Sequence, residues 1–273
     1  MYQLRDSAPL TVTFDTNTLD AVVSPDTAQR GTGSCGTIVQ DAIRAGRIRG
    51  FFSETVFTLE GITNADRPDV LGKTGIAFRS SSSGPNQITS EIAVRHFRKP
   101  LDPRAFDRIQ RALTLGMQPL RTAARFGGYR SPNKDYATYE PDGGISELVC
   151  CMEEVNALTT EIMRRGLGTA AAIKLGLQFS ERDGVTGLEF FQQGLGRAKD
   201  KRERKRVAAV VREWADGESI AAHYGFGMQL FCSEDSGRST PSRSALDTEN
   251  RQWLSTTFGI QFITLAELAG EAA

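Results

Sequence analysis

Short β-rich runs alternate with helix-like runs at both ends of the chain, and this alternation limits the folds open to it more than any other feature. Near the start, residues 10–15 read as a strand, residues 35–45 as a helix with one apolar face, and residues 48–53 as a second strand. Near the end, residues 228–232 and 261–264 read as strands that lie between helical runs. Strands separated by helices favour parallel pairing, so the sequence predicts an α/β fold.

Acidic residues follow the predicted strands. Asp15 ends the first strand, and Asp235 comes three residues after Cys232. Side chains at these positions would emerge at the carboxyl edge of the sheet, where open α/β folds place their ligand sites. Glu60 lies in the otherwise apolar run 56–62, and a buried carboxylate is costly unless it is paired or metal-bound. We therefore expect these carboxylates to share a site.

Each acidic residue also has an ordinary structural interpretation. Those that follow strands suit turns. Residues 206–214 and 220–224 read as two helices, and Asp216 would cap the second one. Glu218 is close enough in sequence to be the site residue in place of Asp216, and the sequence does not choose between them.

Several carboxylates gathered at one sheet edge repel one another, so some of them must take up protons unless a cation is present. Magnesium and manganese prefer oxygen ligands and are typically held by a few carboxylates together with substrate phosphate. Such a site suits the hydrolysis of phosphodiester bonds. The acidic set therefore predicts a Mg²⁺ or Mn²⁺ cofactor.

The order of these motifs resembles that of the PIN-domain ribonucleases. The resemblance rests on the following segments: Thr11–Asn17, 53–60, 216–222, 230–235 and 259–268. It implies a three-layer α/β/α sandwich with a central parallel sheet, a divalent-metal site, and hydrolytic cleavage of RNA that leaves a 3′-hydroxyl and a 5′-phosphate.

Matched position by position, the resemblance assigns the metal-binding and catalytic roles to four carboxylates: Asp15, Glu60, Asp216 and Asp235. Asn17 and Ser233 match the small polar residues that support such ligands. One departure concerns Asp216, which stands four residues before Ile220 where the family more often has three, and this leaves Glu218 as an alternative ligand.

We expect one PIN-like domain over residues 1–273. Its core would join residues 10–62 to residues 206–268. The segment from 64 to 198 is far longer than in compact members of the family, and we interpret it as a mixed insertion whose role the resemblance does not specify.

Contacts with RNA must be local, because the chain has 33 basic and 33 acidic residues and lacks the overall basic excess of proteins that coat nucleic acid. The charged run 197–206 and a basic segment with interleaved aromatic residues are the candidates. The residues expected to contact RNA are Arg197, Lys199, Lys201, Arg202, Arg121 and Arg125. The ordinary interpretation of such a run is a solvated helix face.

Two other functions stay open. Residues 14–18 approximate the D-x-D-x-T motif of haloacid-dehalogenase-like phosphatases, although Asn17 replaces the second acid. A PIN-like scaffold with an incomplete metal site would bind RNA or protein without cutting. An antitoxin or another protein partner, and a homodimer, are both compatible with the sequence.

A cytoplasmic location is expected. No apolar run approaches the length of a membrane span, and the first residues lack the apolar core of a signal peptide. The four cysteines show no C-x-x-C spacing, which favours reduced thiols over a zinc site.

Overall fold

The computed structural model describes residues 8–24, 33–73, 75–84, 87–95, 102–122, 138–185, 190–235 and 244–273. Within this part of the chain, five strands form a parallel sheet in the order β5-β2-β1-β6-β7. The strands are β1 (Leu10–Phe14), β2 (Ile48–Ser53), β5 (Gln118–Leu120), β6 (Leu230–Cys232) and β7 (Gln261–Ile263). Helices cover both faces, so the expected three-layer α/β/α architecture is confirmed.

Strand β1 lies at the centre of the sheet. It pairs with β2 along its whole length, from Leu10 opposite Ile48 to Phe14 opposite Phe52. On its other side it pairs with β6, where Phe14 lies opposite Cys232. The chain thus extends the sheet in one direction through β2 and β5 and in the other through β6 and β7. The topological switch point falls between β1 and β6, the place where open α/β sheets bind ligands.

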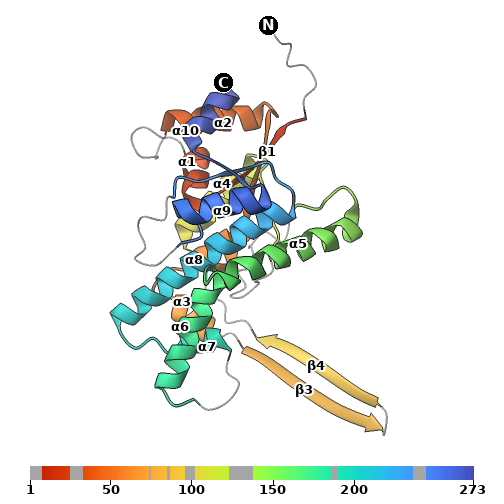
Figure 1. Ribbon diagram of the computed structural model, residues 1–273, viewed down its shortest axis with the longest axis vertical. Coiled ribbons are helices and arrows are strands. Elements are labelled where there is room, and N and C mark those ends of the chain that lie inside the picture. The colour runs from red at the N-terminus through yellow and green to blue at the C-terminus, as the bar shows by residue number, and fades with distance from the viewer. Residues whose placement is uncertain are drawn as a thin grey trace.

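Alternating side chains of the strands separate two cores, as the period of two in a strand requires. Phe52 faces the first core, which packs against α1 (Thr16–Val23), α2 (Gly33–Arg44), α4 (Pro103–Thr114) and α10 (Leu265–Ala272). Its neighbour Phe51 faces the second core, which packs against α5 (Gly144–Arg164), α9 (Thr248–Phe258) and the C-terminal part of α8 (Lys201–Gly225). Figure 1 shows α1, α2 and α10 together at one end of the molecule and α5, α8 and α9 crossing its middle.

A third apolar cluster lies beyond the sheet, around the N-terminal half of α8. It joins Trp214 and Val211 of α8 to side chains of α3 (Arg67–Lys73), α6 (Thr169–Arg182) and α7 (Phe191–Leu195). Leu59, which precedes Glu60, belongs to the same cluster. Helix α8 therefore spans two cores, and the site described below lies along the stretch between them.

The segment 64–198 was expected to be an insertion, yet parts of it belong to the same sheet and core as residues 10–62. Strand β5 pairs with β2 in the central sheet, and α4 packs in the first core. The rest of the segment adds α5 to the second core, supplies α3, α6 and α7 to the third cluster, and forms an antiparallel ribbon of β3 (Gly75–Gly84) and β4 (Gln87–Arg95), which projects from the body (Figure 1). No helix in the described part of the chain could cross a membrane, since none is both long and apolar enough.

The expectation of two helices at 206–214 and 220–224 was wrong, because α8 runs unbroken through both. Asp216, which was expected to cap a second helix, lies inside α8 and is followed by Gly217. In the helix Gly217 serves close packing instead, since a Cβ there would lie 3.1 Å from the Cα of Gly168. A glycine inside a helix costs on the order of 1 kcal/mol relative to alanine, which the surrounding burial offsets.

Candidate functional site

Asp15 connects the end of β1 to the start of α1. Its Oδ1 accepts a hydrogen bond from the backbone N–H of Thr16 at 2.8 Å, so that Asp15 is the N-cap of α1. Its own N–H continues the sheet by donating to the carbonyl of Cys232 at 3.0 Å. The residue is 8% exposed. The helix that begins at Thr16 was not expected from the sequence.

Glu60 is the last residue of a short π-helix, η2 (Val56–Glu60). The residue at the N-cap position is Thr55, and its hydroxyl instead donates to Ser53 Oγ at 2.9 Å. The four residues before Glu60 are all buried, so this turn is packed on every side. Single π-turns of this kind are frequent at functional sites. The carboxylate of Glu60 accepts a hydrogen bond from the hydroxyl of Thr16.

Asp216 lies in the middle of α8 and is not a helix cap. Ala209, Arg212, Glu213 and Asp216 follow helical spacing and line one cleft. Glu218, two residues further on, is only 3% exposed and does not line this cleft. Of the two alternatives that the sequence left open, Asp216 is the one that the fold brings to the cleft.

The loop after β6 brings Ser233 and Asp235 to the same edge. The Ser233 hydroxyl donates to Asp15 Oδ2 at 2.9 Å and accepts a hydrogen bond from the N–H of Asp235 at 3.1 Å. Ser233 therefore ties the two acidic segments together. The side-chain oxygen of Asn17 lies 3.5 Å from the N–H of Glu234, at the limit of a hydrogen bond.

These elements enclose a cleft of about 260 Å³ at the switch point of the sheet. Its walls come from four separate stretches of the chain. The lining residues are Asp15, Thr16, Asn17, Asp20, Glu60, Ala209, Arg212, Glu213, Asp216 and Asp235. All four carboxylates that the sequence placed in one site thus lie around one cleft.

The carboxylates affect one another's ionisation. Burial, and next the charge of Glu60, raise the pKa of Asp15 from 3.8 to about 7, although the Ser233 hydroxyl acts in the opposite direction. Burial also raises the pKa of Asp216 well above its ordinary value, and the charges of Asp15 and Glu60 add to this rise. Near neutral pH the carboxylates of the cleft are therefore not all ionised unless a cation binds among them.

Two arginines behind the cleft offset part of this charge. Arg67 is 4% exposed, and its guanidinium donates to the carbonyls of Ile62 at 3.2 Å and Ala208 at 2.9 Å. Burial lowers the pKa of Arg67 to about 10, while Glu60 and Asp216 act to raise it. Arg251 is partly buried and donates to the carbonyl of Asp235.

The donor set fits a hard divalent cation in its chemistry, since carboxylate oxygens are the ligands that Mg²⁺ and Mn²⁺ prefer. The side chains do not converge on one point as they stand, because no three Asp, Glu, His or Cys groups in the described ranges are close enough together to hold an ion. Hydrogen bonds from Ser233 to Asp15 and from Thr16 to Glu60 keep two of the carboxylates against the walls. Ion binding would require them to turn inward.

The basic residues expected to contact RNA are divided by the structure. Lys199 Nζ lies 2.7 Å and Arg197 Nη1 4.0 Å from Asp183, so both are engaged with an acidic side chain. Lys201 and Arg202 are exposed at the start of α8. Arg121 donates to the Thr138 hydroxyl at 2.9 Å and does not line the cleft, and Arg125 lies outside the described residues.

Sequence reasoning missed several residues of the cleft. Arg212 is exposed at its rim, and Glu213 is buried with Oε1 accepting from Ala245 N–H at 2.8 Å. Asp20 lines the cleft but is paired with Arg108, whose Nη2 lies 2.7 Å from Oδ2. Arg212 and Glu213 would have been found by their spacing from Asp216 had α8 been predicted as one helix.

No protein-family model matches the chain, and no curated protein matches it in sequence. The resemblance to PIN-domain ribonucleases therefore stays a prediction from the motif order.

The raised pKa of Asp15 predicts how stability depends on pH. Folded protein keeps the Asp15 proton up to about pH 7, whereas the unfolded chain loses it near 3.8, so Asp15 destabilises the fold increasingly as pH rises from about 4 to 7. Asp15→Asn removes this term. The free energy of unfolding of the variant should exceed that of wild type by on the order of 1 to 4 kcal/mol across that range. Urea unfolding with a chelator present measures this difference.

The pH dependence of wild-type stability alone does not isolate Asp15, because His223 changes stability with pH in the opposite direction. Burial lowers the pKa of His223 from 6.5 to about 3, so its contribution favours folding increasingly as pH rises towards 6.5. This term is common to both proteins and cancels in the difference. Parallel stability curves for wild type and Asp15→Asn would contradict the assignment of a raised pKa to Asp15.

Proposed function

We propose that this protein is a metal-dependent endoribonuclease of PIN type that hydrolyses RNA phosphodiester bonds in the cytoplasm. One observation supports the proposal above all others. Asp15, Glu60, Asp216 and Asp235 come from four distant stretches of the chain and line one cleft at the switch point of a parallel sheet. Apart from ligand binding, the stability of the fold gains nothing from bringing these charges together.

The four carboxylates would hold one or two Mg²⁺ or Mn²⁺ ions. When bound, such ions supply charge neutralisation and Lewis-acid polarisation of the scissile phosphate. The 260 Å³ cleft leaves room for a phosphate group beside them. The Arg212 guanidinium at the rim would contact a non-bridging phosphate oxygen, because guanidinium groups match phosphate geometry and keep their charge.

Asp15 has the properties of a metal ligand in this reaction. Burial raises its pKa to about 7 in the absence of a cation, and a bound cation would displace the proton and keep the carboxylate ionised. The Ser233 hydroxyl and the Thr16 N–H fix the two carboxylate oxygens, at 2.9 and 2.8 Å respectively. The attacking water would give up a proton to solvent as its oxygen bonds to phosphorus, the P–O3′ bond would break, and the leaving oxygen would take up a proton to become the 3′-hydroxyl.

A scaffold that binds RNA or protein without cutting is the second candidate. It is favoured by the spacing of the carboxylates, since no three acidic, histidine or cysteine groups of the described chain are gathered tightly enough for an ion without movement. The two candidates differ in one property that can be measured. The nuclease requires cleavage that depends on a divalent cation, whereas the scaffold binds with or without one.

Substitution of the carboxylates tests the nuclease directly. Asp15→Asn and Asp216→Asn should each lower manganese-dependent cleavage of a labelled RNA by about a hundredfold or more, since loss of an outer partner alone typically costs 10- to 100-fold. Glu218→Gln is the matched control, because Glu218 is buried two residues from Asp216 and does not line the cleft. Its activity should stay near that of wild type.

Circular dichroism and thermal unfolding would establish that the variants are folded. If Asp15→Asn cuts at the wild-type rate, the assignment of the cleft is wrong. Activity lost in Glu218→Gln and kept in Asp216→Asn would move the third ligand to Glu218.

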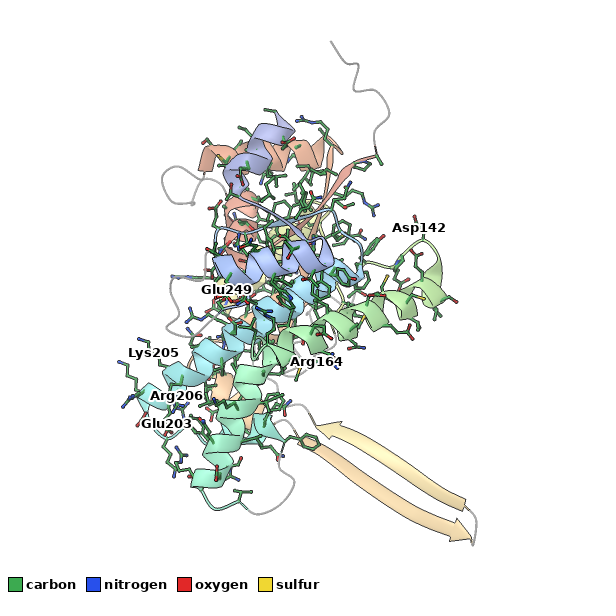
Figure 2. The ribbon with its side chains drawn as sticks, viewed as in Figure 1. Asp142, Arg164, Glu203, Lys205, Arg206 and Glu249 are labelled. Carbon is green, nitrogen blue, oxygen red and sulfur yellow. The ribbon has the colours of Figure 1, made fainter. Side chains whose placement is uncertain are left out.

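A basic track on α8 leads out of the cleft. Arg202 lies seven residues, and Lys205 four residues, before Ala209 of the cleft, so both share its helical face and lie about 10 and 6 Å from it along the axis. Both side chains are exposed, and Figure 2 shows Lys205 pointing away from the body of the protein. Neither forms an ion pair within the described residues. We expect an RNA strand that leaves the cleft to follow them.

This track makes a prediction about salt. Arg202→Gln combined with Lys205→Gln should weaken RNA binding and lower the slope of log affinity against log salt by about 0.7 per lost phosphate contact. Lys199→Gln is the control, since that lysine is already paired with Asp183 at 2.7 Å. Fluorescence anisotropy with single-stranded RNA in calcium at several salt concentrations measures both. Equal slopes for the double variant and the control would remove the track from the binding site.

A further inference from the structure

The N-terminal half of α5 extends beyond the rest of the molecule. The buried residues of this helix begin only at Val155 and continue with Leu158 and Ile162, which pack in the second core. Figure 1 shows the preceding turns projecting from the side of the protein, and Figure 2 places Asp142 at their outer tip. Two large apolar side chains lie on this projection, Ile145 at 82% and Val149 at 51% exposure.

The projection is a formed helix held at both ends. At its inner end, α8 packs directly against it, since a Cβ on Gly225 would lie 2.7 Å from both the carbonyl oxygen of Cys151 and the backbone nitrogen of Val155. At its outer end, the Glu147 carboxylate accepts a hydrogen bond from the N–H of Gly143 at 2.6 Å. The exposed apolar residues are therefore presented on a defined surface.

These residues form one row with an acidic residue at each end. Ile145, Val149 and Glu153 follow one another at four-residue intervals, so they share a helical face, and Asp142 lies in the turn just before the helix begins at Gly144. All four are exposed. We call the row Asp142, Ile145, Val149 and Glu153 the α5 row. Its pattern is acid, apolar, apolar, acid.

The surroundings of the α5 row are also negative. Residues 138–160 include five acidic residues and no lysine, arginine or histidine. Those five are Glu140, Asp142, Glu147, Glu153 and Glu154. Within the described residues none of them forms an ion pair. A surface of this charge repels RNA and anionic lipid, so it serves a different partner from the basic track on α8.

The charge pattern also argues against a second copy of this chain. Two α5 rows that cover each other's apolar residues would bring Asp142 and Glu153 close to the same acidic residues of the other copy, which repel. Basic side chains at the same spacing would attract them. Two exposed apolar side chains flanked by carboxylates are thus complementary to two apolar side chains flanked by lysine or arginine.

We propose that the α5 row is a docking site for a basic amphipathic helix of a partner protein. The partner's row has two apolar side chains one turn apart, which cover Ile145 and Val149, and a lysine or arginine one turn beyond each, which pairs with Asp142 or Glu153. This is recognition of a helix by an apolar surface with a charged rim. It is independent of the nuclease proposal, because the row does not line the catalytic cleft.

A designed peptide pair tests the proposal. One labelled helical peptide has the row Arg, Leu, Leu, Lys at helical spacing, and a second has Glu in place of Arg and Lys. Fluorescence anisotropy should show saturable binding of the basic peptide to the wild-type protein and at least tenfold weaker binding of the acidic one. Ile145→Gln with Val149→Gln should weaken basic-peptide binding at least tenfold, and Asp142→Lys with Glu153→Lys should reverse the preference.

Leu177→Gln is the matched control, because Leu177 is 50% exposed on α6, away from the row, and its loss should leave the affinity unchanged. Alkylation of Cys150, an exposed free thiol on the same helix, should slow when the basic peptide is bound. No saturable binding, equal binding to the Gln variant, or no charge preference would overturn the proposal. So would a wild-type dimer in sedimentation that the Gln variant converts to a monomer, because the row would then be covered by a second copy.

Discussion

Repulsion among the carboxylates at the carboxyl edge of β1 and β6 is the constraint on which the site depends. Asp15 and Asp216 both have raised pKa values because they are buried and because each faces the other acidic groups. The fold can hold them together because each is carried by an element anchored in apolar packing: β1 in the first core, and α8 in the second and third. Each fully buried large apolar side chain contributes about 1.5 to 3 kcal/mol, so these anchors exceed the electrostatic cost.

The wall of the cleft is arranged so that this repulsion is reduced only in part. Arg67 and Arg251 provide positive charge from behind, yet the hydrogen bonds of Arg67 go to backbone carbonyls of Ile62 and Ala208. Such an arrangement leaves the carboxylate oxygens that face the cleft available for a ligand. Protonation relieves the remaining repulsion at low pH, and in the proposed function a divalent cation would relieve it near neutral pH. The same negative potential repels RNA, which is why the proposed function needs both the cation and the basic residues on α8.

The parts of the fold that could be predicted are those where local pattern and final structure agree. The β-branched run 10–14 became the central strand, and the acidic residue after it emerged at the sheet edge, as the rule for parallel sheets requires. The strand 48–53 was likewise predicted with the bounds that the structure gives it. The convergence of Asp15, Glu60, Asp216 and Asp235 on one cleft followed from these placements together with the motif order.

What could not be predicted depends on contacts distant in sequence. The pair Asp216 and Gly217 has the local appearance of a helix boundary, and the approach of Gly168, distant in sequence, explains why a glycine stands inside α8. The π-helix that ends at Glu60 is fixed by packing on several sides, which periodicity of 3.6 residues does not describe. Arg67 shows no sign in the sequence that it would be buried beside two carboxylates.

Proton release on cation binding tests the central claim most directly. If Mn²⁺ enters the cleft, it displaces the proton that burial and Glu60 keep on Asp15. Calorimetric titration with Mn²⁺ at pH 7 in two buffers of different ionisation enthalpy should show saturable binding with release of a fraction of a proton or more. That release should diminish as the pH is raised past the pKa values of Asp15 and Asp216, both of which burial raises. An absence of saturable binding, or binding at pH 7 with the same enthalpy in both buffers, would contradict the account.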